Sequence, residues 1–167
     1  MSANVYERPD DSRLLRYGIV GGIVAGIVFA LAEMFINLIF GRPFFGPLRL
    51  ISTIVLGTQA AQPGYSLVTA AIVGIVVHMI MSAVYGIVFI YLLALARQLM
   101  TPAWRIVLYG AIFGFLLWVL NFLVIAPIAF PQFTQVDQLW NGFIAHTVFF
   151  GAVLGWYIAA VDENLLE

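Results

Sequence analysis

The chain contains no cysteine and no lysine, and it has few charged residues of either sign. The absence of cysteine excludes disulfides, thiolate nucleophiles, cysteine-ligated zinc and iron–sulfur clusters. Charged residues make up 9% of the sequence, against roughly a quarter in soluble domains. The net charge of −1 provides no basic surface for nucleic acid. A surface this poor in charge is not suited to water, so these absences predict an integral membrane protein.

Most of the sequence consists of long apolar runs. Hydrophobic residues are 63% of the chain and the mean hydropathy is +1.06. A membrane-spanning helix needs about 20 apolar residues, and four runs reach that length, at residues 17–40, 66–93, 106–126 and 139–161. We therefore predict an all-α integral membrane protein, a four-helix bundle in one domain over residues 1–167. A polar segment (1–16) precedes the spans and a short tail (162–167) follows them.

The arginines predict the orientation of the bundle, because basic residues concentrate on the cytoplasmic side of a membrane. Five arginines lie before the first run or between the second and third, and two lie on the opposite side. This asymmetry predicts that both termini are cytoplasmic, in what we expect to be a prokaryotic cytoplasmic membrane. The five are Arg8, Arg13, Arg16, Arg97 and Arg105, and the two are Arg42 and Arg49.

Residues 44–57 form an apolar segment that is too short to span a membrane. Arg49 lies inside it, and Pro and Gly residues flank it on both sides. One interpretation is a short interfacial or re-entrant helix on the outer face. The alternative is a hydrophobic loop packed on the top of the bundle.

The second half of the chain resembles the first. The pattern R-x3-Y-G-x3-G begins at Arg13 and again at Arg105. A Gly-x3-His pair, followed by Ala-Val-x-Gly, occurs at His78 and at His146, with one extra residue after the second histidine. We predict two helical hairpins, 17–93 with an insertion at 41–65, and 105–161. A π-bulge would absorb the extra residue, and the symmetry axis would lie along the membrane normal.

Glycines recur at intervals of four on three of the predicted spans. Such small residues let two helices approach closely enough to gain dispersion contacts that lipid does not provide. We therefore assign a helix-packing role to Gly18, Gly22, Gly26, Gly110, Gly114, Gly151 and Gly155.

Ionisable residues inside a membrane are costly and are usually paired or functional. Three lie within the predicted spans, Glu33, His78 and His146, and the strongest neutral polar companions are Asn37 and Asn121. Glu33 and Asn37 share one face, because they are four residues apart. Glu33 is a candidate proton carrier, or else a polar contact that ties helices together.

The two histidines fit three roles. Bis-imidazole ligation of one haem b between neighbouring helices is the first, and a proton or quinone role is the second. The third is a hydrogen bond from each histidine across the bundle, the same structural task performed twice. We expect no metal site, since the sequence has no further histidine and only one carboxylate within the spans.

Three functions follow from these features. We expect a non-catalytic accessory subunit of a larger membrane assembly. Its partners would be other membrane subunits and lipids, with no soluble substrate. In its small size and small mass outside the membrane, the chain resembles the small accessory subunits of respiratory or photosynthetic electron-transfer complexes. The alternatives are a small proton-coupled transporter using Glu33 and a haem- or quinone-binding protein using His78 and His146. A single glutamate in the first of four spans is similar to the format of the small multidrug resistance family, whose chains are shorter and lack the insertion after the first span.

Overall fold

The computed structural model describes residues 11–96 and 102–161, and these ranges contain helices and connecting turns but no strand. Four helices are long and apolar enough to cross a membrane: Asp11–Ile39, Leu67–Leu95, Trp104–Ala129 and Leu139–Val161. Within these ranges, the prediction of an all-α chain with four helices long and apolar enough to cross a membrane is thus confirmed. Residues 1–10 of the predicted polar segment, Arg97 and the predicted tail 162–167 lie outside the described residues.

The first two long helices have different residues at their starts. Helix α1 (Asp11–Ile39) extends further toward the N-terminus than the apolar run that begins at Tyr17. The residues before Tyr17 are mostly polar, so they belong to the helix but not to the apolar run. Asp11 in its first turn also suits the positive end of the helix dipole. Helix α3 (Leu67–Leu95) follows Ser66, whose hydroxyl accepts a hydrogen bond from the Thr69 backbone N–H at 3.3 Å, as an N-cap residue does.

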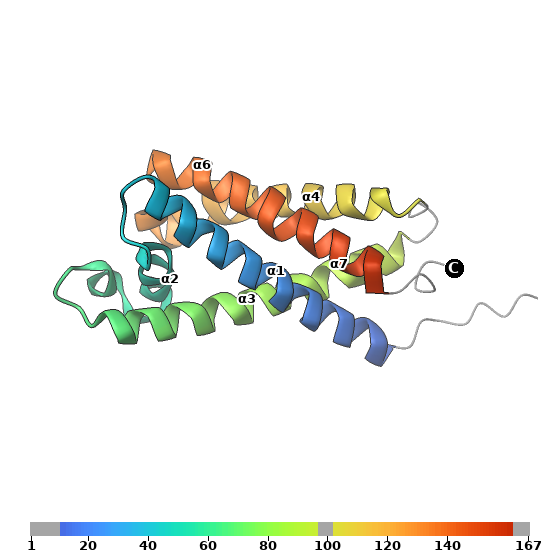
Figure 1. The fold of residues 1–167 in the computed structure, drawn as a ribbon, viewed down its shortest axis with the longest axis horizontal. Helices are drawn as coiled ribbons and strands as arrows, with labels where there is room; N and C mark the ends of the chain where they lie inside the picture. Colours follow the sequence, from blue (N-terminus) through green and yellow to red (C-terminus); the bar gives the residue numbers. More distant parts are fainter. Residues whose placement is uncertain (1–10, 97–101, 162–167) are drawn as a thin grey trace, which may run out of the picture.

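The long helices run side by side along one axis (Figure 1). Helix α1 packs against α3 on one side, and on another against η5 (Ala145–Ala152) and α7 (Val153–Val161), which continue α6 (Val136–Ile144). Helix α4 (Trp104–Trp118) packs on η5 and α7. The start of α1 and the end of α7 lie at the same end of the bundle (Figure 1). The core between them is apolar and includes Ala25, Phe29, Ile90, Ile106, Phe113, Phe150, Leu154 and Ile158.

The third span changes its helical form along its length. After α4 comes η3 (Val119–Ile125), a π-helix, then α5 (Ala126–Ala129) and the 3-10 turn η4 (Pro131–Phe133). The span passes Pro127 and ends at Ala129, beyond the expected end at Ala126. Proline is tolerated in the first turn of a helical segment, where its missing N–H is not needed, and Pro127 holds that position in α5.

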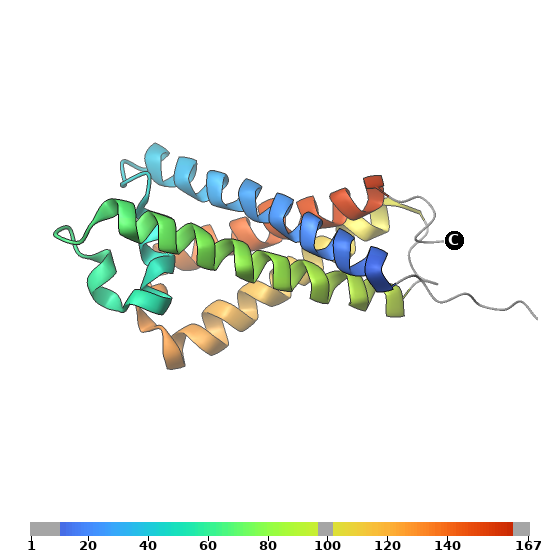
Figure 2. The same cartoon turned by 90° about the horizontal axis from the view of Figure 1, so that it is seen from below.

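Residues 44–57 contain a helix, α2 (Gly46–Leu56), so the helical interpretation holds over that of a loop. Figure 2 shows the end of the third span diverging from α3, with α2 between the two. Helix α2 packs on α3 so closely that a Cβ added at Gly74 would lie 2.8 Å from the Leu48 carbonyl carbon. Ser52 and Thr53 on α2 are buried. Gly41 and Gly57 adopt φ of +69° and +81° in the turns on either side of the helix.

The connection from α2 to α3 is held by Arg49. Its guanidinium donates hydrogen bonds to the carbonyl oxygens of Gln62, at 3.1 Å, and Tyr65. These bonds cross the 3-10 helix η1 (Thr58–Ala61) and the turn that follows it. Arg49 therefore ties the connection to α2.

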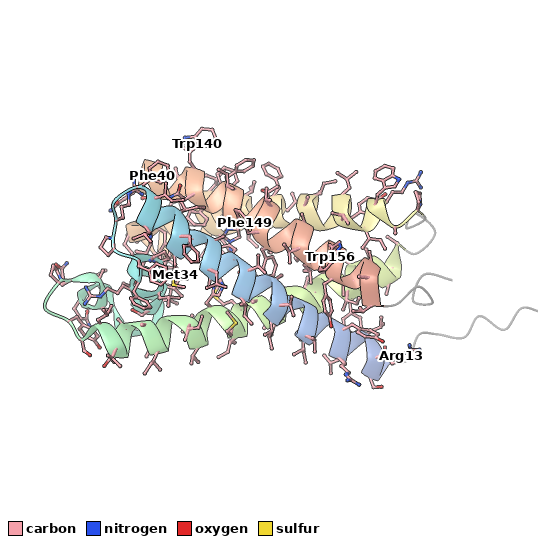
Figure 3. The ribbon with its side chains drawn as sticks, viewed as in Figure 1. Arg13, Met34, Phe40, Trp140, Phe149 and Trp156 are labelled. Carbon is pink, nitrogen blue, oxygen red and sulfur yellow. The ribbon has the colours of Figure 1, made fainter. Side chains whose placement is uncertain are left out.

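The aromatic residues at the span ends point outward. Trp104, Trp140 and Trp156 are each at least 60% exposed. Figure 3 shows Trp140 and Phe40 at one end of the bundle and Arg13 at the opposite end. Trp118 lies within the third span, where its indole N–H donates to the Leu139 carbonyl at 2.9 Å. That bond satisfies the one polar group of this half-buried side chain.

Candidate functional site

His78 links α3 to α1 inside the bundle. Its Nε2 lies 2.9 Å from the Gly26 carbonyl oxygen, and its side chain is buried. A carbonyl oxygen only accepts, so Nε2 carries the hydrogen and Nδ1 is the acceptor nitrogen of the neutral ring. The close approach of the two helices at Gly26 brings this backbone oxygen within reach of the imidazole.

The Phe29 ring lies between the two histidines. Its centroid is 4.9 Å from that of His78 and 4.9 Å from that of His146. The histidines thus belong to one cluster, but an aromatic side chain occupies the space between them. A haem between the two imidazoles would require the Phe29 ring to leave this position.

His146 is held by its own helix and by a polar contact with the third span. Its Nδ1 donates to the Gly142 carbonyl at 2.9 Å, which leaves Nε2 as the acceptor. The Asn121 amide nitrogen lies 3.5 Å from that Nε2, a long contact, and the Tyr85 hydroxyl donates to the Asn121 Oδ1 at 3.1 Å. One polar network therefore connects α3, η3 and η5.

Both helices that hold the Asn121–His146 pair are π-helical at this point. Asn121 lies in η3, and His146 lies in η5, whose turns are wider than those of an α-helix. Each backbone hydrogen bond of a π-helix spans five residues instead of the four of an α-helix, so the side chains after it face different directions than they would in a continuous α-helix. Segment η5 also lies where the alignment of the two halves requires one additional residue after the histidine. π-Helices are rare and often occur at functional sites.

Glu33 faces the bundle interior in α1. It lies on the face that includes Gly26, Phe29 and Ala30, all of which are buried. Its side chain is half-buried, and its carboxyl forms no hydrogen bond or ion pair with any residue that the structure describes. Glu33 is one helical turn from Phe29 on the same face of α1.

Asn37 is separate from this cluster. Its side-chain nitrogen lies 3.3 Å from the position of a Cβ on Gly46, at the start of α2. The prediction that Glu33 and Asn37 share a face is consistent with the continuous helix. Of the five polar residues singled out in the spans, the structure brings His78, His146 and Asn121 together.

The glycines lie at two helix crossings. In the first, α1 meets α3: a Cβ at Gly18 would lie 2.8 Å from the Ile87 Cα, and one at Gly86 would lie 2.7 Å from the Gly22 Cα. Gly26 faces Ser82 at the same crossing. Real Cβ atoms essentially never approach within 3.0 Å, so a side chain at these positions would force the helices apart.

The second crossing joins α4 to η5 and α7. A Cβ at Gly110 would lie 2.9 Å from the Gly155 Cα, and one at Gly114 would lie 3.0 Å from the Gly151 Cα. These four glycines, with Gly18, Gly22 and Gly26, complete the predicted packing set. Each lies where another helix approaches its backbone.

Sequence reasoning missed three members of the site. Phe29 separates the imidazoles, Tyr85 donates to Asn121, and Thr147 has a buried hydroxyl oxygen without a hydrogen-bond partner in the described chain. The sequence offered one signal for Tyr85: the repeated motif has a polar tyrosine at this position in the first half and Leu154 in the second. Phe29 and Thr147 carry no such signal.

Within residues 11–96 and 102–161, no group of three or more His, Cys, Asp or Glu side chains is placed to hold a metal ion. Comparison of the chain with protein-family models, curated proteins and solved structures found no match.

Proposed function

We propose that this protein is a non-catalytic accessory subunit of a larger membrane assembly, with a respiratory or photosynthetic electron-transfer complex as the kind of assembly that fits its format. One observation carries the proposal. The interior groups His78, Asn121 and His146 are bonded to other parts of the same chain. They hold α1, α3, η3 and η5 together, which is a structural task.

The outer surface supports lateral binding. In the most apolar stretch of each span, only 17% to 39% of residues are buried within the chain, and the third span is the least covered. An aromatic face extends across α4 and α6: Trp118 lies 6.0 Å from Phe115 and 5.4 Å from Phe143 between ring centroids, and Phe143 lies 6.4 Å from Trp140. Rigid aromatic side chains are enriched where proteins bind partners.

The proposal includes the predicted duplication of a helical hairpin. Each pair of spans has one glycine crossing, since a Cβ at Gly86 would lie 2.7 Å from the Gly22 Cα and one at Gly151 would lie 3.0 Å from the Gly114 Cα. The repeated motifs align Gly86 with Gly155, four residues beyond Gly151, so these contacts support two similar crossings and not the register of the motifs. A duplicated hairpin has one crossing per copy, and superposition of an experimental structure of each half would test whether His78 falls on His146.

We further propose a prokaryotic cytoplasmic membrane, with the Arg13 end of the bundle in the cytoplasm and α2 at the outer interface. The arginine asymmetry supports this orientation, as does the position of the described chain ends on one side of the bundle. Because the chain has no cysteine, single cysteines are clean probes. A cysteine at Ser12 should be labelled only after permeabilisation, and labelling from outside would reverse the orientation.

The decisive test is isolation of the protein from its native membrane in a mild detergent. We expect other membrane subunits to co-purify in fixed ratio, and we expect Phe143→Ala with Trp140→Ala to reduce that ratio. Leu95→Ala is the matched control, because Leu95 is 86% exposed at the far end of α3. Purification of the protein alone, with no stoichiometric partner, would contradict the proposal.

The transporter alternative has one observation in its favour, the Glu33 carboxyl that faces the interior without a partner among the described residues. If the isolated protein in liposomes carries out proton-coupled transport that Glu33→Gln abolishes, the accessory-subunit proposal is wrong. A Soret band in the purified protein, lost in His78→Leu and His146→Leu, would instead favour the haem alternative.

A further inference from the structure

A polar pair joins α3 to the third span within the membrane-spanning part of the chain. The Tyr85 hydroxyl donates a hydrogen bond to the Asn121 Oδ1 at 3.1 Å. Asn121 lies eight residues before the end of its span at Ala129 (129 minus 121), which is about 12 Å along a helix. At this depth its carboxamide is surrounded by hydrocarbon, where lipid provides no hydrogen-bond partner.

The Asn121 carboxamide has hydrogen-bonding capacity that the described chain does not use. It carries two N–H donors. One contacts the His146 Nε2 at 3.5 Å, about half an ångström beyond the usual length of such a bond. The other has no partner within residues 11–96 and 102–161. The Tyr85 hydroxyl oxygen, which donates its hydrogen to Asn121, can still accept. The pair therefore presents one donor and one acceptor side by side.

The pair lies at the surface of the bundle and not in its core. The side chains of Tyr85 and Asn121 are both half-buried. Val88, one helical turn after Tyr85, is 44% exposed, and Leu120, the neighbour of Asn121, is 45% exposed. Only 17% of the most apolar stretch of the third span is buried within the chain. A donor and an acceptor are thus accessible on a surface that otherwise suits lipid.

The chemistry of the pair favours one class of partner group. A carboxamide side chain both accepts and donates hydrogen bonds, so it complements the Asn121 N–H and the Tyr85 oxygen together. Acyl chains can do neither, and a carbonyl compound without polar hydrogens only accepts. Side chains such as asparagine and glutamine form hydrogen bonds between helices inside membranes. The complementary group is therefore expected on a membrane helix.

We propose that Tyr85 and Asn121 are the contact point for a partner subunit's membrane helix that presents an asparagine or glutamine side chain at this depth. The inference rests on the proposed function, because an accessory subunit binds its partners laterally. It adds the position of one such contact and the side chain that the partner contributes.

The test uses a synthetic single-span peptide as the probe. Its apolar core is leucine, with one asparagine eight residues from one end to match the depth of Asn121, and a second peptide has leucine at that position. The chain has no cysteine, so a dye on Ser12→Cys reports association with a dye-labelled peptide in liposomes by energy transfer. We expect the asparagine peptide to associate about three- to thirtyfold more tightly. Equal association of the two peptides would overturn the site.

Variants of the chain assign the preference to one residue. Asn121→Leu removes the donor, so both peptides should then associate equally. Asn37→Leu is the matched control, because it removes the same side chain from another span, near Gly46, and it should leave the preference unchanged. A preference that persists in Asn121→Leu would overturn the role of Asn121. The comparison of the two peptides on the chain with Asn121 intact does not depend on whether either variant folds.

Two further measurements separate this inference from the proposals above. A short-chain benzoquinone only accepts hydrogen bonds, so at a concentration equal to that of the peptide it should not displace the asparagine peptide, after correction with a sample that lacks the peptide dye. Displacement would assign the pair to a carbonyl ligand and overturn the helix contact.

Isolation of the protein from its native membrane provides the second measurement. If other subunits co-purify but the two peptides associate equally, this contact is wrong and the accessory-subunit proposal stands. If the protein purifies alone but prefers the asparagine peptide, the polar contact stands and the accessory-subunit proposal is wrong.

Discussion

Substitution of Gly22 by alanine tests the close crossing of α1 and α3. A Cβ at this position would lie 2.9 Å from the Ser82 carbonyl carbon and 3.0 Å from the Ala83 Cα, and the Ser82 oxygen is closer still. Ordinary contact begins at 3.4 Å, so the helices must separate by at least 0.5 Å (3.4 minus 2.9). The obstacle is backbone, so no side-chain rotation relieves it.

The expected magnitude follows from this separation. A gap of about 0.5–1 Å forfeits roughly a quarter to a half of the dispersion energy at each contact. Overpacking of this kind costs about 1–3 kcal/mol, and alanine recovers at most about 1 kcal/mol of helix propensity. We therefore expect Gly22→Ala to lower the free energy of unfolding by about 1–2 kcal/mol.

Substitution of Gly26 by alanine provides the comparison for Gly22→Ala, because the obstacle at Gly26 is a side chain and not backbone. The nearest obstacle to a Cβ at Gly26 is the Ser82 side chain, with its Cβ at 2.6 Å. Removing that side chain with Ser82→Gly should therefore rescue Gly26→Ala but not Gly22→Ala. A double-mutant cycle for each pair measures the difference.

The assay is unfolding by sodium dodecyl sulfate of protein in mild detergent micelles, followed by tryptophan fluorescence. Gly64→Ala is the control, because no heavy atom lies within 4 Å of a Cβ there, and it should stay within about 0.5 kcal/mol of the unchanged protein. If Ser82→Gly rescues both variants equally, or if Gly22→Ala is as stable as Gly64→Ala, the backbone-contact argument is refuted.

Three further predictions concern single interactions. His78→Leu removes the bond to the Gly26 carbonyl and should lower the free energy of unfolding by about 0.5–1.5 kcal/mol in the same assay; a stability equal to that of the unchanged protein would remove the structural role of His78. Tyr85→Phe should cost about 0.6 kcal/mol and should cost nothing further once Asn121 is replaced by leucine, as a double-mutant cycle would show. Gly110→Ala should destabilise the second crossing as much as Gly22→Ala destabilises the first, and a change below about 0.5 kcal/mol would indicate that the crossings are not equivalent.

Much of the helical framework follows from the sequence, because spanning length and apolar composition are local properties. The four spans lie where hydropathy places them, and the glycines that recur every four residues lie at helix crossings. The bounds were less predictable: α1 begins at Asp11 rather than Tyr17, because hydropathy reports the apolar stretch and not the helix start.

The relation between the polar residues depended on the tertiary structure. Sequence spacing places Glu33 and Asn37 on one face, but only packing shows that Asn37 meets α2 and that Phe29, one turn before Glu33, is buried. The depth and rotation of a side chain depend on how the helices cross and on the π-helical turns of η3 and η5. Neither is a local property of the sequence.

The sequence by itself thus determined that the chain has four helices long and apolar enough to cross a membrane. It also determined where their backbones can approach closely, since both properties depend on residue type at short spacing. Only the tertiary structure decided that Phe29 separates His78 from His146 and that Tyr85 reaches Asn121. It also decided that α2 lies between α3 and the end of the third span. The physical reason is that these relations join residues far apart in the chain, and their geometry is set by the packing of whole helices.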